Sequence, residues 1–340
     1  MELKLKQPKS LSEIAELIAV DLPGDVAALD KIIITSVATL ENSAPGCISF
    51  LSNPIYKSKL ATTQASAVIV AAEDAQHCQT TALISNNPRL ALAKVLELCS
   101  EVQKPIISSI HPTAVIGDNV QIGANVIIGP YVVIGSNCKL GDNSELKPHV
   151  TVYDNVTIGA RCTIHSNSVL GSDGFGYAVN NDGSWYKMPH LGGLIIGDDV
   201  EIGSNTSIDR GMIENTVIGN NVIIDNLVQI GHNVHIGDRS AIAGCVGIAG
   251  STSIGKGCLI GGAACIAGHL TIADNVHITG TSAVNHSLPT AGVYSSGFPA
   301  KENSVWRRNV ARFMFLDNMA KRIRELEKKF KINETMVGYE

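Results

Sequence analysis

Aliphatic residues recur at every sixth position through most of the chain, and small or polar residues fill the places between them. A helix would repeat after about 3.6 residues and a strand after about two, so neither gives this spacing. A hexapeptide period is typical of a parallel β-helix, in which each hexad forms one short strand and one turn. The repeat positions are Ile110, Ile116, Ile122, Ile128, Ile134, Leu140, Leu146, Val152, Ile158, Ile164, Leu170, Ile196, Ile202, Ile208, Ile218, Ile224, Ile230, Ile236, Ile242, Ile248, Ile254, Ile260, Ile266, Ile272, Ile278 and Val284.

The hexads predict a mainly β fold that resembles the left-handed parallel β-helix, whose triangular coils take three hexads, or about 18 residues, each. The handedness comes from this resemblance and not from the period, because parallel crossovers are usually right-handed. Such coils bury few aromatic side chains and need residues with positive φ or no Cβ at their tight corners. The composition agrees, with 4% aromatic residues, 45% hydrophobic residues and 32 glycines.

Changes in sequence texture divide the chain into three predicted parts. Residues 1–105 lack the hexads and alternate helical with strand-like runs, which predicts a small α/β domain. Hexads occupy residues 106–293, apart from an excursion over 171–195 that gathers aromatic residues such as Phe175 and Trp185. Long loops on rigid scaffolds tend to carry function, although a loop that only packs on the coil beneath it is the alternative. We predict a C-terminal helical extension over residues 294–340.

The N-terminal region has clear local signals. Ser10 and Glu13 form a capping-box pattern at the start of an amphipathic helix. A second helix is predicted over residues 89–98, behind the pair Asn87-Pro88. Short strand-like runs lie at 32–34, 47–50, 67–70 and 82–84. These patterns establish a fold type for the region but no function.

The C-terminal region is amphipathic and basic. Apolar residues recur at helical spacing from Val305 to Lys331, which predicts one or two helices. We expect these helices to cap the end of the β-helix, because an open sheet edge invites pairing with other chains. Their basic face suggests an acidic partner, although a solvated face without a partner is the alternative. The basic residues are Arg307, Arg308, Arg312, Lys321, Arg322, Arg324, Lys328 and Lys329.

Charge, hydropathy and cysteine content exclude several classes of protein. A net charge of −5 gives no overall attraction to nucleic acid. The first residues form no signal peptide, and no apolar run reaches the roughly 20 residues of a transmembrane segment. We therefore expect a cytoplasmic protein. The eight cysteines include no C-x-x-C pair, so we interpret them as small buried residues in a reducing compartment.

Two of the ten histidines stand out as candidates for chemistry. His232 and His269 each follow a glycine at a predicted corner, and they are 37 residues apart, which is two coils and one residue. Both should therefore project near the same corner, about 9–10 Å apart along the axis if neighbouring coils have the usual strand spacing. A groove of that size suits a sugar or a thioester head group.

Gly250 completes this candidate site. It follows His232 by 18 residues, so its backbone N–H should face whatever His232 contacts. A general base with an N–H donor nearby is the minimum apparatus for acyl transfer.

A zinc site is the alternative reading of the histidines, because some hexapeptide helices hold zinc with three imidazoles between subunits. His232, His235 and His269 could supply three nitrogen ligands. However, His235 falls late in its hexad, whereas His232 falls early in its own. We therefore expect no metal.

Nine short segments carry a further resemblance: Asp173–Ala178, Ile208–Gly211, Val217–Asn220, Ile224–Asn226, Gln229–Asn233, Ala243–Gly244, Ala249–Gly250, Gly261–Gly262 and Gly292–Gly297. Together they resemble the family of UDP-3-O-acylglucosamine N-acyltransferases of lipid A biosynthesis. The likeness covers nearly the whole chain, and the order of the domains is more specific than any single motif.

The resemblance implies a function in bacterial outer membrane biogenesis. The family moves a 3-hydroxyacyl chain from acyl carrier protein to the 2-amino group of UDP-3-O-(3-hydroxyacyl)-glucosamine. Residues 1–105 would then bind the uridine of this sugar nucleotide. No tightly bound cofactor is implied, because the acyl group arrives on the 4'-phosphopantetheine of the carrier protein. The basic C-terminal helices would dock that carrier protein, whose surface is acidic.

The resemblance also assigns roles to catalytic residues. His232 matches the proton acceptor of the family, His269 its second active-site histidine, and Gly250 the donor to the oxyanion.

A second set of residues matches the substrate-binding positions of the family. Phe50, Asn53 and Tyr56 match the residues that bind uracil. Asp225 and Asn226 match polar residues beside the nucleophile.

Triangular coils present flat faces, and closed symmetry is the usual outcome for soluble oligomers, so we predict a homotrimer with active sites between neighbours. Two other functions remain open from the sequence. One is an acetyl-CoA-dependent hexapeptide acetyltransferase, and the other is a nucleotide-sugar-binding scaffold without catalysis.

Overall fold

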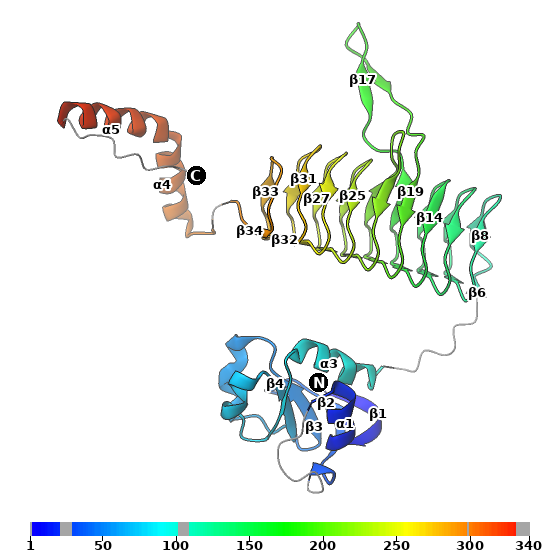
Figure 1. Ribbon diagram of the computed structural model, residues 1–340, viewed down its shortest axis with the longest axis vertical. Coiled ribbons are helices and arrows are strands. Elements are labelled where there is room, and N and C mark those ends of the chain that lie inside the picture. Colours follow the sequence, from blue (N-terminus) through cyan, green and yellow to red (C-terminus); the bar gives the residue numbers. More distant parts are fainter. Residues whose placement is uncertain (1, 21–28, 101–108, 298, 331–340) are drawn as a thin grey trace. The chain divides into compact units, whose positions relative to one another are not determined.

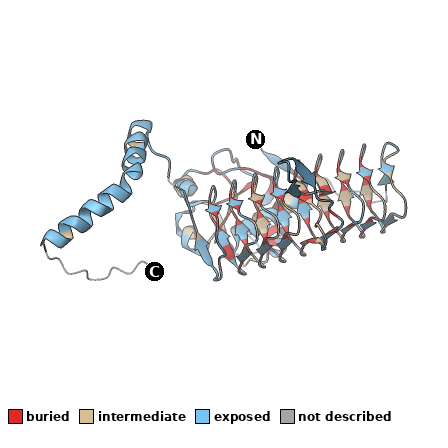
Figure 2. Cartoon of the chain, turned by 90° about the horizontal axis from the view of Figure 1, so that it is seen from above, coloured by how far each residue is buried: buried red, intermediate tan, exposed pale blue. Residues whose placement is uncertain are grey.

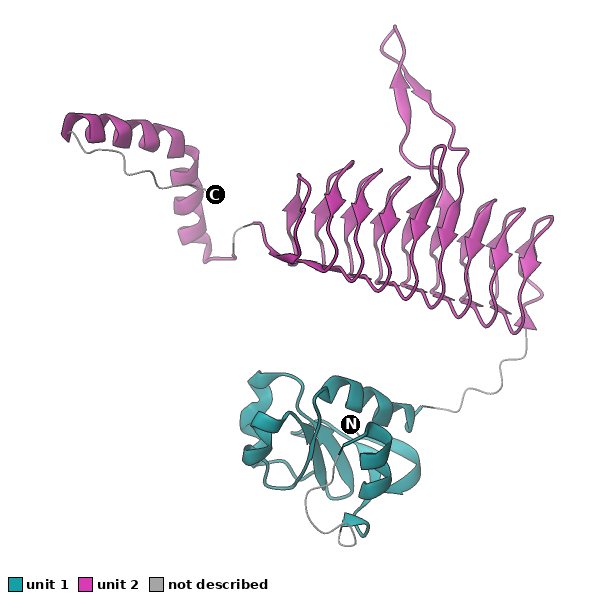
Figure 3. Ribbon diagram, viewed as in Figure 1, with its two compact units in different colours: residues 1–105 teal, residues 106–340 magenta. Residues whose placement is uncertain are grey.

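A computed structural model describes residues 2–20, 29–100, 109–297 and 299–330 of the chain (Figure 1). The chain divides into two compact units, residues 1–105 and residues 106–340 (Figure 3). Each unit is described separately below. None of the described helices is long and apolar enough to cross a membrane.

The first unit is a five-stranded sheet with helices against it. The strands follow the order β1-β2-β3-β4-β5, with β1 antiparallel to β2 and the other pairs parallel. They are β1 Leu3–Ser10, β2 Ile33–Val37, β3 Cys47–Phe50, β4 Ala67–Val70 and β5 Thr81–Ile84. The α-helices are α1 Leu11–Ile18 and α3 Pro88–Glu97, and the 3-10 helices are η1 Pro54–Ala61 and η2 Ala72–His77.

Strand alternation gives this sheet an apolar core on each face. Ile69 packs in a cluster with residues of α1 and α3, whereas its neighbours Val68 and Val70 pack in a second cluster with Leu60 of η1. Successive side chains of a strand point to opposite faces, so β4 can be buried on both. This covering by helices on one face and η1 on the other explains the continuous apolar run in β4.

The predicted helix caps of the first unit are confirmed. The Ser10 side chain accepts from the N–H of Glu13, and the Glu13 carboxylate accepts from the N–H of Ser10, which completes the capping box of α1. Asn87 caps α3 by accepting from the N–H of Leu90. Strand β1 was not predicted, because its sequence alternates lysines with only a few apolar residues.

The second unit contains three long parallel sheets, which confirms the predicted fold class of a parallel β-helix. Sheet I consists of β6 Ser109–Ile110, β9 Ile127–Ile128, β12 Glu145–Leu146, β15 Thr163–Ile164, β20 Glu201–Ile202, β23 Ile223–Ile224, β26 Ala241–Ile242, β29 Leu259–Ile260, β32 Val276–Ile278 and β34 Gly292–Tyr294. Sheet II consists of β7 Val115–Ile116, β10 Val133–Ile134, β13 Thr151–Val152, β16 Val169–Ser172, β21 Ser207–Asp209, β24 Gln229–Ile230, β27 Gly247–Ile248, β30 Cys265–Ile266 and β33 Ala283–Val284. Sheet III consists of β8 Gln121–Ile122, β11 Lys139–Leu140, β14 Val156–Ile158, β19 Leu194–Ile196, β22 Thr216–Ile218, β25 His235–Ile236, β28 Ser253–Ile254 and β31 Thr271–Ile272.

The coils pair in a constant register apart from a shift between Leu170 and Ser172, where the excursion begins. Ile218 pairs with Ile236, and Ile236 with Ile254, so the aliphatic position of one hexad stacks on that of the coil below. From Ile128 to Val284 these positions are buried in one continuous core (Figure 2). Ile110, in the first coil, is 47% exposed. The six-residue period therefore identifies the residues that are buried in the core.

The corners of the coils use two kinds of residue. The third residue of most corners has φ between 54° and 64°, and asparagine is the residue found there most often, as at Asn119 and Asn221. Asparagine tolerates this left-handed region better than most residues. Glycine has another role here: a Cβ on Gly141 would lie 2.4 Å from the backbone of Gly159 in the next coil. Most of the corner glycines are therefore needed for close stacking and not for positive φ.

Two further segments leave the regular coils. The excursion carries a hairpin of β17 Tyr177–Val179 and β18 Trp185–Lys187 (Figure 1). The C-terminal region forms two helices, α4 Asn303–Met314 and α5 Leu316–Phe330. Neither helix buries a residue in the described chain, and the capping of the β-helix by these helices stays a prediction from the sequence. Residues 331–340 of the predicted extension lie outside the described part of the chain.

Candidate active site

His232 lies at the corner between sheets II and III, directly after β24. Its Nδ1 is 3.0 Å from Asn233 Oδ1. That oxygen also accepts from the N–H of Met212 at 2.9 Å, and Asn233 Nδ2 donates to the carbonyl of Glu214. These two bonds fix the orientation of the amide, so Oδ1 faces the histidine as an acceptor. The hydrogen of the neutral His232 ring therefore sits on Nδ1, and Nε2 is left as the basic nitrogen.

Gly250 lies one coil beyond His232, directly against its basic edge. A Cβ on Gly250 would be 2.7 Å from His232 Nε2 and 2.9 Å from Cε1. Glycine is thus required here because any side chain would occupy the place of the imidazole. The predicted proximity of these two residues is what the structure shows.

The N–H of Gly250 is available for a ligand. At several equivalent corner positions the N–H donates to a side chain of the next coil, as Ala124 does to Asp142 and Lys256 to Asp274. The residue after Gly250 in this stack is Gly268, which has no side chain to offer. Within residues 109–297, no acceptor lies within bonding distance of the Gly250 N–H. A basic nitrogen and a free N–H donor therefore lie side by side.

His269 lies on the same corner but in a different turn position. It has φ of 61°, like Asn233 and Ser251, and it is exposed. Its N–H donates to the carbonyl of Gly250 at 3.1 Å. His269 therefore stacks over Asn233 and Ser251, whereas Gly250 stacks over His232. His232 and His269 are separated by two coils and one further residue. The two imidazoles therefore project from neighbouring positions of the same corner and do not stack directly on each other.

The excursion adds residues to this corner that the sequence did not identify. His190 is buried, and its ring meets the ring of His232 with centroids 5.2 Å apart in an edge-to-face arrangement. Asp209, at the end of β21, accepts from Ser172 and from Gln229, each at 3.1 Å. No period relates His190 to His232, so only the folded loop brings these two residues together, whereas Asp209 belongs to β21, whose Ile208 pairs with Ile230.

Burial raises the pKa of the Asp209 carboxyl above its usual range, although the bonds from Ser172 and Gln229 and the nearby His232 and His190 act in the opposite direction. A raised folded-state pKa means that the folded chain disfavours the charged form. The unfolded carboxyl ionises near pH 3.9. Burial of the carboxylate therefore lowers the free energy of unfolding above that pH and has no such effect below it.

We predict that Asp209→Asn raises the melting temperature near pH 7, because asparagine fills the same space without a buried charge. The gain should disappear near pH 3.5, where the wild-type carboxyl is protonated in the unfolded chain. Thermal unfolding at the two pH values measures this, with Asp118→Asn at an exposed corner as the control. A variant that melts below the wild type near pH 7 would show that the carboxylate is stabilising.

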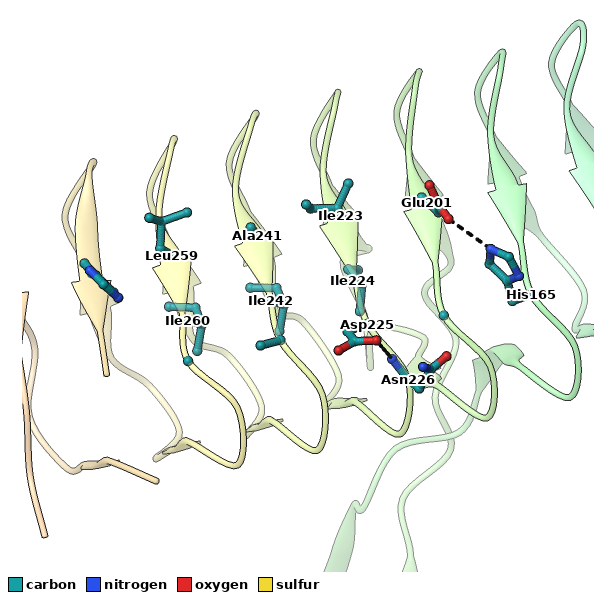
Figure 4. Close-up of a pocket in the computed structure, with 14 residues that line it drawn as sticks. His165, Glu201, Ile223, Ile224, Asp225, Asn226, Ala241, Ile242, Leu259 and Ile260 are labelled. Atoms are coloured by element: carbon teal, nitrogen blue, oxygen red, sulfur yellow. Dashed lines mark hydrogen bonds and ion pairs between the residues drawn. The ribbon is translucent and has the colours of Figure 1, made fainter. Parts of the chain in front are cut away.

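A second hollow lies on the outer face of sheet I. It has a volume of about 650 Å³, and its lining residues include His165, Glu201, Asp225 and Asn226 (Figure 4). Asp225 and Asn226 lie at the corner after β23, between sheets I and II, with Asn226 N–H bonded to Asp225 Oδ1 at 2.8 Å. His232 belongs to the next corner along the coil. The structure therefore does not bring Asp225 and Asn226 beside His232 within one chain.

The uracil-binding residues predicted in the first unit lie around two neighbouring cavities. Phe50 and Tyr56 line one of about 340 Å³, together with Leu51 and Ser52. Asn53 lines the adjacent cavity, and its side chain accepts from the N–H of Ile55 at the start of η1. Phe50 is half-buried and Tyr56 is exposed. Two aromatic side chains therefore border one cavity, as stacking on a base requires.

The three histidines of the zinc alternative do not gather. His235 lies in β25 on the exposed face of sheet III, away from the corner that holds His232 and His269. Among the described residues, no group of three or more His, Cys, Asp or Glu side chains could hold a metal ion.

Comparisons with known proteins agree with this geometry. Residues 31–98 match the family model described as UDP-3-O-(3-hydroxymyristoyl) glucosamine N-acyltransferase, LpxD. Residues 108–136, 137–172 and 215–250 match the model of bacterial transferase hexapeptide repeats, and residues 251–280 match the hexapeptide repeat of succinyl-transferase. A crystal structure of UDP-N-acetylglucosamine acyltransferase is 26% identical with a TM-score of 0.51, over 67% of this chain and 85% of that one.

The parallel β-helix and the hexapeptide-repeat matches place the chain among the hexapeptide-repeat acyltransferases. Two curated relatives narrow the class: UDP-3-O-acylglucosamine N-acyltransferases of Coxiella burnetii, 44% identical, and of Pseudoalteromonas translucida, 47% identical. Each match covers 94% of this chain and 97% or 98% of the relative. The chain belongs to the UDP-3-O-acylglucosamine N-acyltransferase family, and it is an enzyme.

Proposed function

We propose that the protein transfers a 3-hydroxyacyl group from acyl carrier protein to the 2-amino group of UDP-3-O-(3-hydroxyacyl)-glucosamine, a step of lipid A biosynthesis. One observation carries the chemistry: the basic Nε2 of His232 lies against Gly250, whose N–H has no acceptor in the described chain. The family membership supports the choice of acceptor sugar.

The reaction follows from this pair of groups. His232 Nε2 removes a proton as the amine of the sugar attacks the thioester carbonyl, because an amine must lose a proton to form an amide. The carbonyl oxygen gains negative charge, which the N–H of Gly250 stabilises. When the carbon–sulfur bond breaks, the thiolate leaves and takes the proton from the His232 imidazolium. The products are an N-acylated sugar and a free thiol, and no cofactor is consumed.

Asn233 acts here as a positioning residue. Its Oδ1 holds the Nδ1 hydrogen of His232 and so keeps the basic nitrogen on the side of Gly250. Met212 and Glu214 hold the amide of Asn233 in turn. Such second partners orient a catalytic imidazole in other enzymes that use a histidine base. We place His269 nearer the entrance, where it contacts the sugar or the pantetheine arm, because it is exposed and lies two coils farther on.

The active site is completed by a neighbouring subunit of a homotrimer. In one chain, Asp225 and His232 lie at different corners of the triangle, on either side of sheet II. A threefold arrangement would place the Asp225 corner of one copy against the His232 corner of the next, and such closed symmetry is common.

We predict that two inactive variants complement each other in mixed trimers. Mixed trimers of His232→Ala and Asp225→Ala subunits should have about a third of wild-type activity, because each mixed trimer regenerates one complete site out of three. Activity of co-purified mixed trimers, isolated with two different tags, measures this. If the mixture is no more active than the two separate variants, each site lies within one chain.

In the first unit, Phe50 and Tyr56 bind the uracil ring of the sugar nucleotide. Both border the cavity of about 340 Å³, and a base offers one aromatic face to each side chain. Stacking of a base on an aromatic side chain is worth about 1–3 kcal/mol in other proteins. Asn53 lies beside this cavity, where its Nδ2 is free to donate while Oδ1 caps η1.

Tyr56→Ala should raise the KM for the sugar nucleotide by about tenfold or more and leave the KM for the acyl donor unchanged, because one stacking partner is lost. Steady-state kinetics with each substrate varied in turn measures the two constants. Tyr153→Ala, at an exposed corner of the β-helix, is a control for loss of an exposed tyrosine. Equal rises in both KM values would point to a misfolded domain.

The acyl donor docks on α4 and α5. These helices present basic side chains and expose apolar ones such as Trp306 and Phe313. The Trp306 and Phe313 side chains line a groove of about 480 Å³ together with Arg312. An acidic carrier protein would be attracted to this surface over about a Debye length, roughly 8 Å at physiological salt. The cytoplasmic location remains a prediction from the sequence.

The identity of the donor can be tested with two thioesters. The enzyme should convert the 3-hydroxyacyl carrier protein and ignore acetyl-CoA, and mass spectrometry of the product identifies the chain transferred. Charge reversal at Arg307, Arg308 and Arg312 should slow transfer from the carrier protein while sparing a short acyl-pantetheine donor. Transfer from acetyl-CoA alone would favour the acetyltransferase alternative. No turnover with either donor would favour a binding scaffold.

A further inference from the structure

His190 is the one buried histidine in the described part of the chain, and it is only 4% exposed. It comes from the excursion that interrupts the hexads and not from a coil. Its Nδ1 lies 3.2 Å from the carbonyl of Met188. A carbonyl can only accept, so the hydrogen of the neutral ring sits on Nδ1 and ties His190 to its own loop.

The contacts of His190 converge on the catalytic base. Its ring packs edge-to-face on the His232 ring, with centroids 5.2 Å apart and planes at 73°. Aromatic rings prefer this arrangement to a parallel sandwich, so the contact favours one orientation of each ring. Asn233 holds His232 at Nδ1, Gly250 borders Nε2, and His190 covers a side of the ring that neither of them reaches.

Two glycines of the excursion enclose this pair of rings. A Cβ on Gly174 would lie 2.9 Å from His232 Cβ and 3.1 Å from His190 Nε2. A Cβ on Gly176 would lie 2.6 Å from His190 Cε1. The backbone of this segment therefore packs directly on both imidazoles, with no room for a methyl group. The enclosure leaves His190 Nε2 buried, and no partner lies within bonding distance of it in the described chain.

We propose that His190 is a positioning residue for acyl transfer: its ring holds the His232 imidazole in the orientation in which Nε2 faces Gly250. The proposal rests on the proposed function of His232 as the base. The excursion thereby completes the catalytic corner. His190 acts through its shape, because its free nitrogen is covered by Gly174 and does not reach the surface where a substrate would bind.

Two substitutions at position 190 separate the ring from the nitrogen. His190→Phe keeps a flat ring against His232 and loses both nitrogens. His190→Gln keeps a polar atom near the position of Nε2 and loses the ring. We expect His190→Phe to retain kcat within about threefold, and His190→Gln to lose about tenfold to hundredfold, as a misplaced base does. The KM values for both substrates should change little in either variant.

Gly174→Ala provides a test that leaves His190 in place. The added methyl group must displace His232 or His190, so kcat should fall in the same range as for His190→Gln, about tenfold to hundredfold. Gly183→Ala, where an added Cβ meets nothing within 4 Å, belongs to the same excursion, but its φ of 84° disfavours a side chain. His235→Gln, on the exposed face of sheet III, is therefore the better control and should match the wild type.

All variants would be assayed as full-length trimers, after circular dichroism and sedimentation show that fold and assembly are intact. The crystal structure of His190→Gln should show the His232 ring turned away from Gly250. Full kcat in both His190 variants would overturn the proposal. An active His190→Gln beside an inactive His190→Phe would overturn it as well, because it would show that the nitrogen, and not the ring, is used. Failure of the proposed function itself would look different, since the wild-type enzyme would then transfer no acyl group.

Discussion

Replacing His232 by alanine should lower kcat by about 10²–10⁴-fold, which is the usual cost of losing a positioned general base. The imidazole is half-buried at a corner, and its Nε2 is the one nitrogen left basic by the bond to Asn233. The coil core below it is formed by Val228, Ile230 and Val234, which the substitution does not touch. The fold and the proposed trimer should therefore survive, and single-turnover kinetics with saturating donor would measure the chemical step.

His269→Ala is the matched comparison, because it removes a second imidazole from the same corner. His269 is exposed and contributes only its backbone N–H to the ladder, so its loss should reduce apparent affinity more than kcat. If His269→Ala proves the less active enzyme and His232→Ala keeps near-normal kcat, the roles of the two histidines are reversed.

Gly250→Ala should lower kcat by about 10²-fold or more, even though it adds only one methyl group. The new Cβ would sit 2.7 Å from His232 Nε2, so the ring must turn away from the reacting amine. The backbone N–H of residue 250 remains, so the loss would report on the displaced base and not on a lost oxyanion donor. Gly250 has no positive φ, and alanine introduces no backbone strain.

Gly247→Ala is the control for this substitution. It lies in the same coil, three residues earlier, and an added Cβ there meets nothing within 4 Å. Its kcat should be close to that of the wild type. A Gly250→Ala enzyme with kcat within about threefold of the wild type would mean that His232 does not act from the orientation seen here.

The β-helix could be predicted from the sequence because an aliphatic side chain marks each buried position. Ile224, Ile242 and Ile260 are six-residue positions whose burial depends on neighbours one coil away, and those neighbours repeat the same residue type. The C-terminal helices could be located by their period but not placed. Their apolar faces are exposed in the described chain, and the pattern does not say which surface they would pack against.

The proposed catalytic pair was accessible to the same arithmetic, since Gly250 lies one coil from His232 and the coils from β24 to β30 are each 18 residues long. His190 and Asp209 were not, because the excursion breaks the count and its path depends on contacts such as Arg210 with the carbonyl of Gly171. Asn233 follows His232 directly. Asparagine also occupies equivalent corner positions, such as Asn205 and Asn221, because the backbone there has positive φ. Nothing in the sequence marked Asn233 as a partner of the base.

The constant register of the regular coils also sets how length changes can be accommodated. A duplication or deletion of 18 residues adds or removes one complete coil, so every later residue returns to its own corner. A change of six residues would rotate all later coils by one face and carry His269 away from the corner of His232. Within the regular coils, a change in length therefore keeps the two halves of the proposed catalytic corner on the same edge when it is a multiple of a full turn or is looped out, as the excursion is.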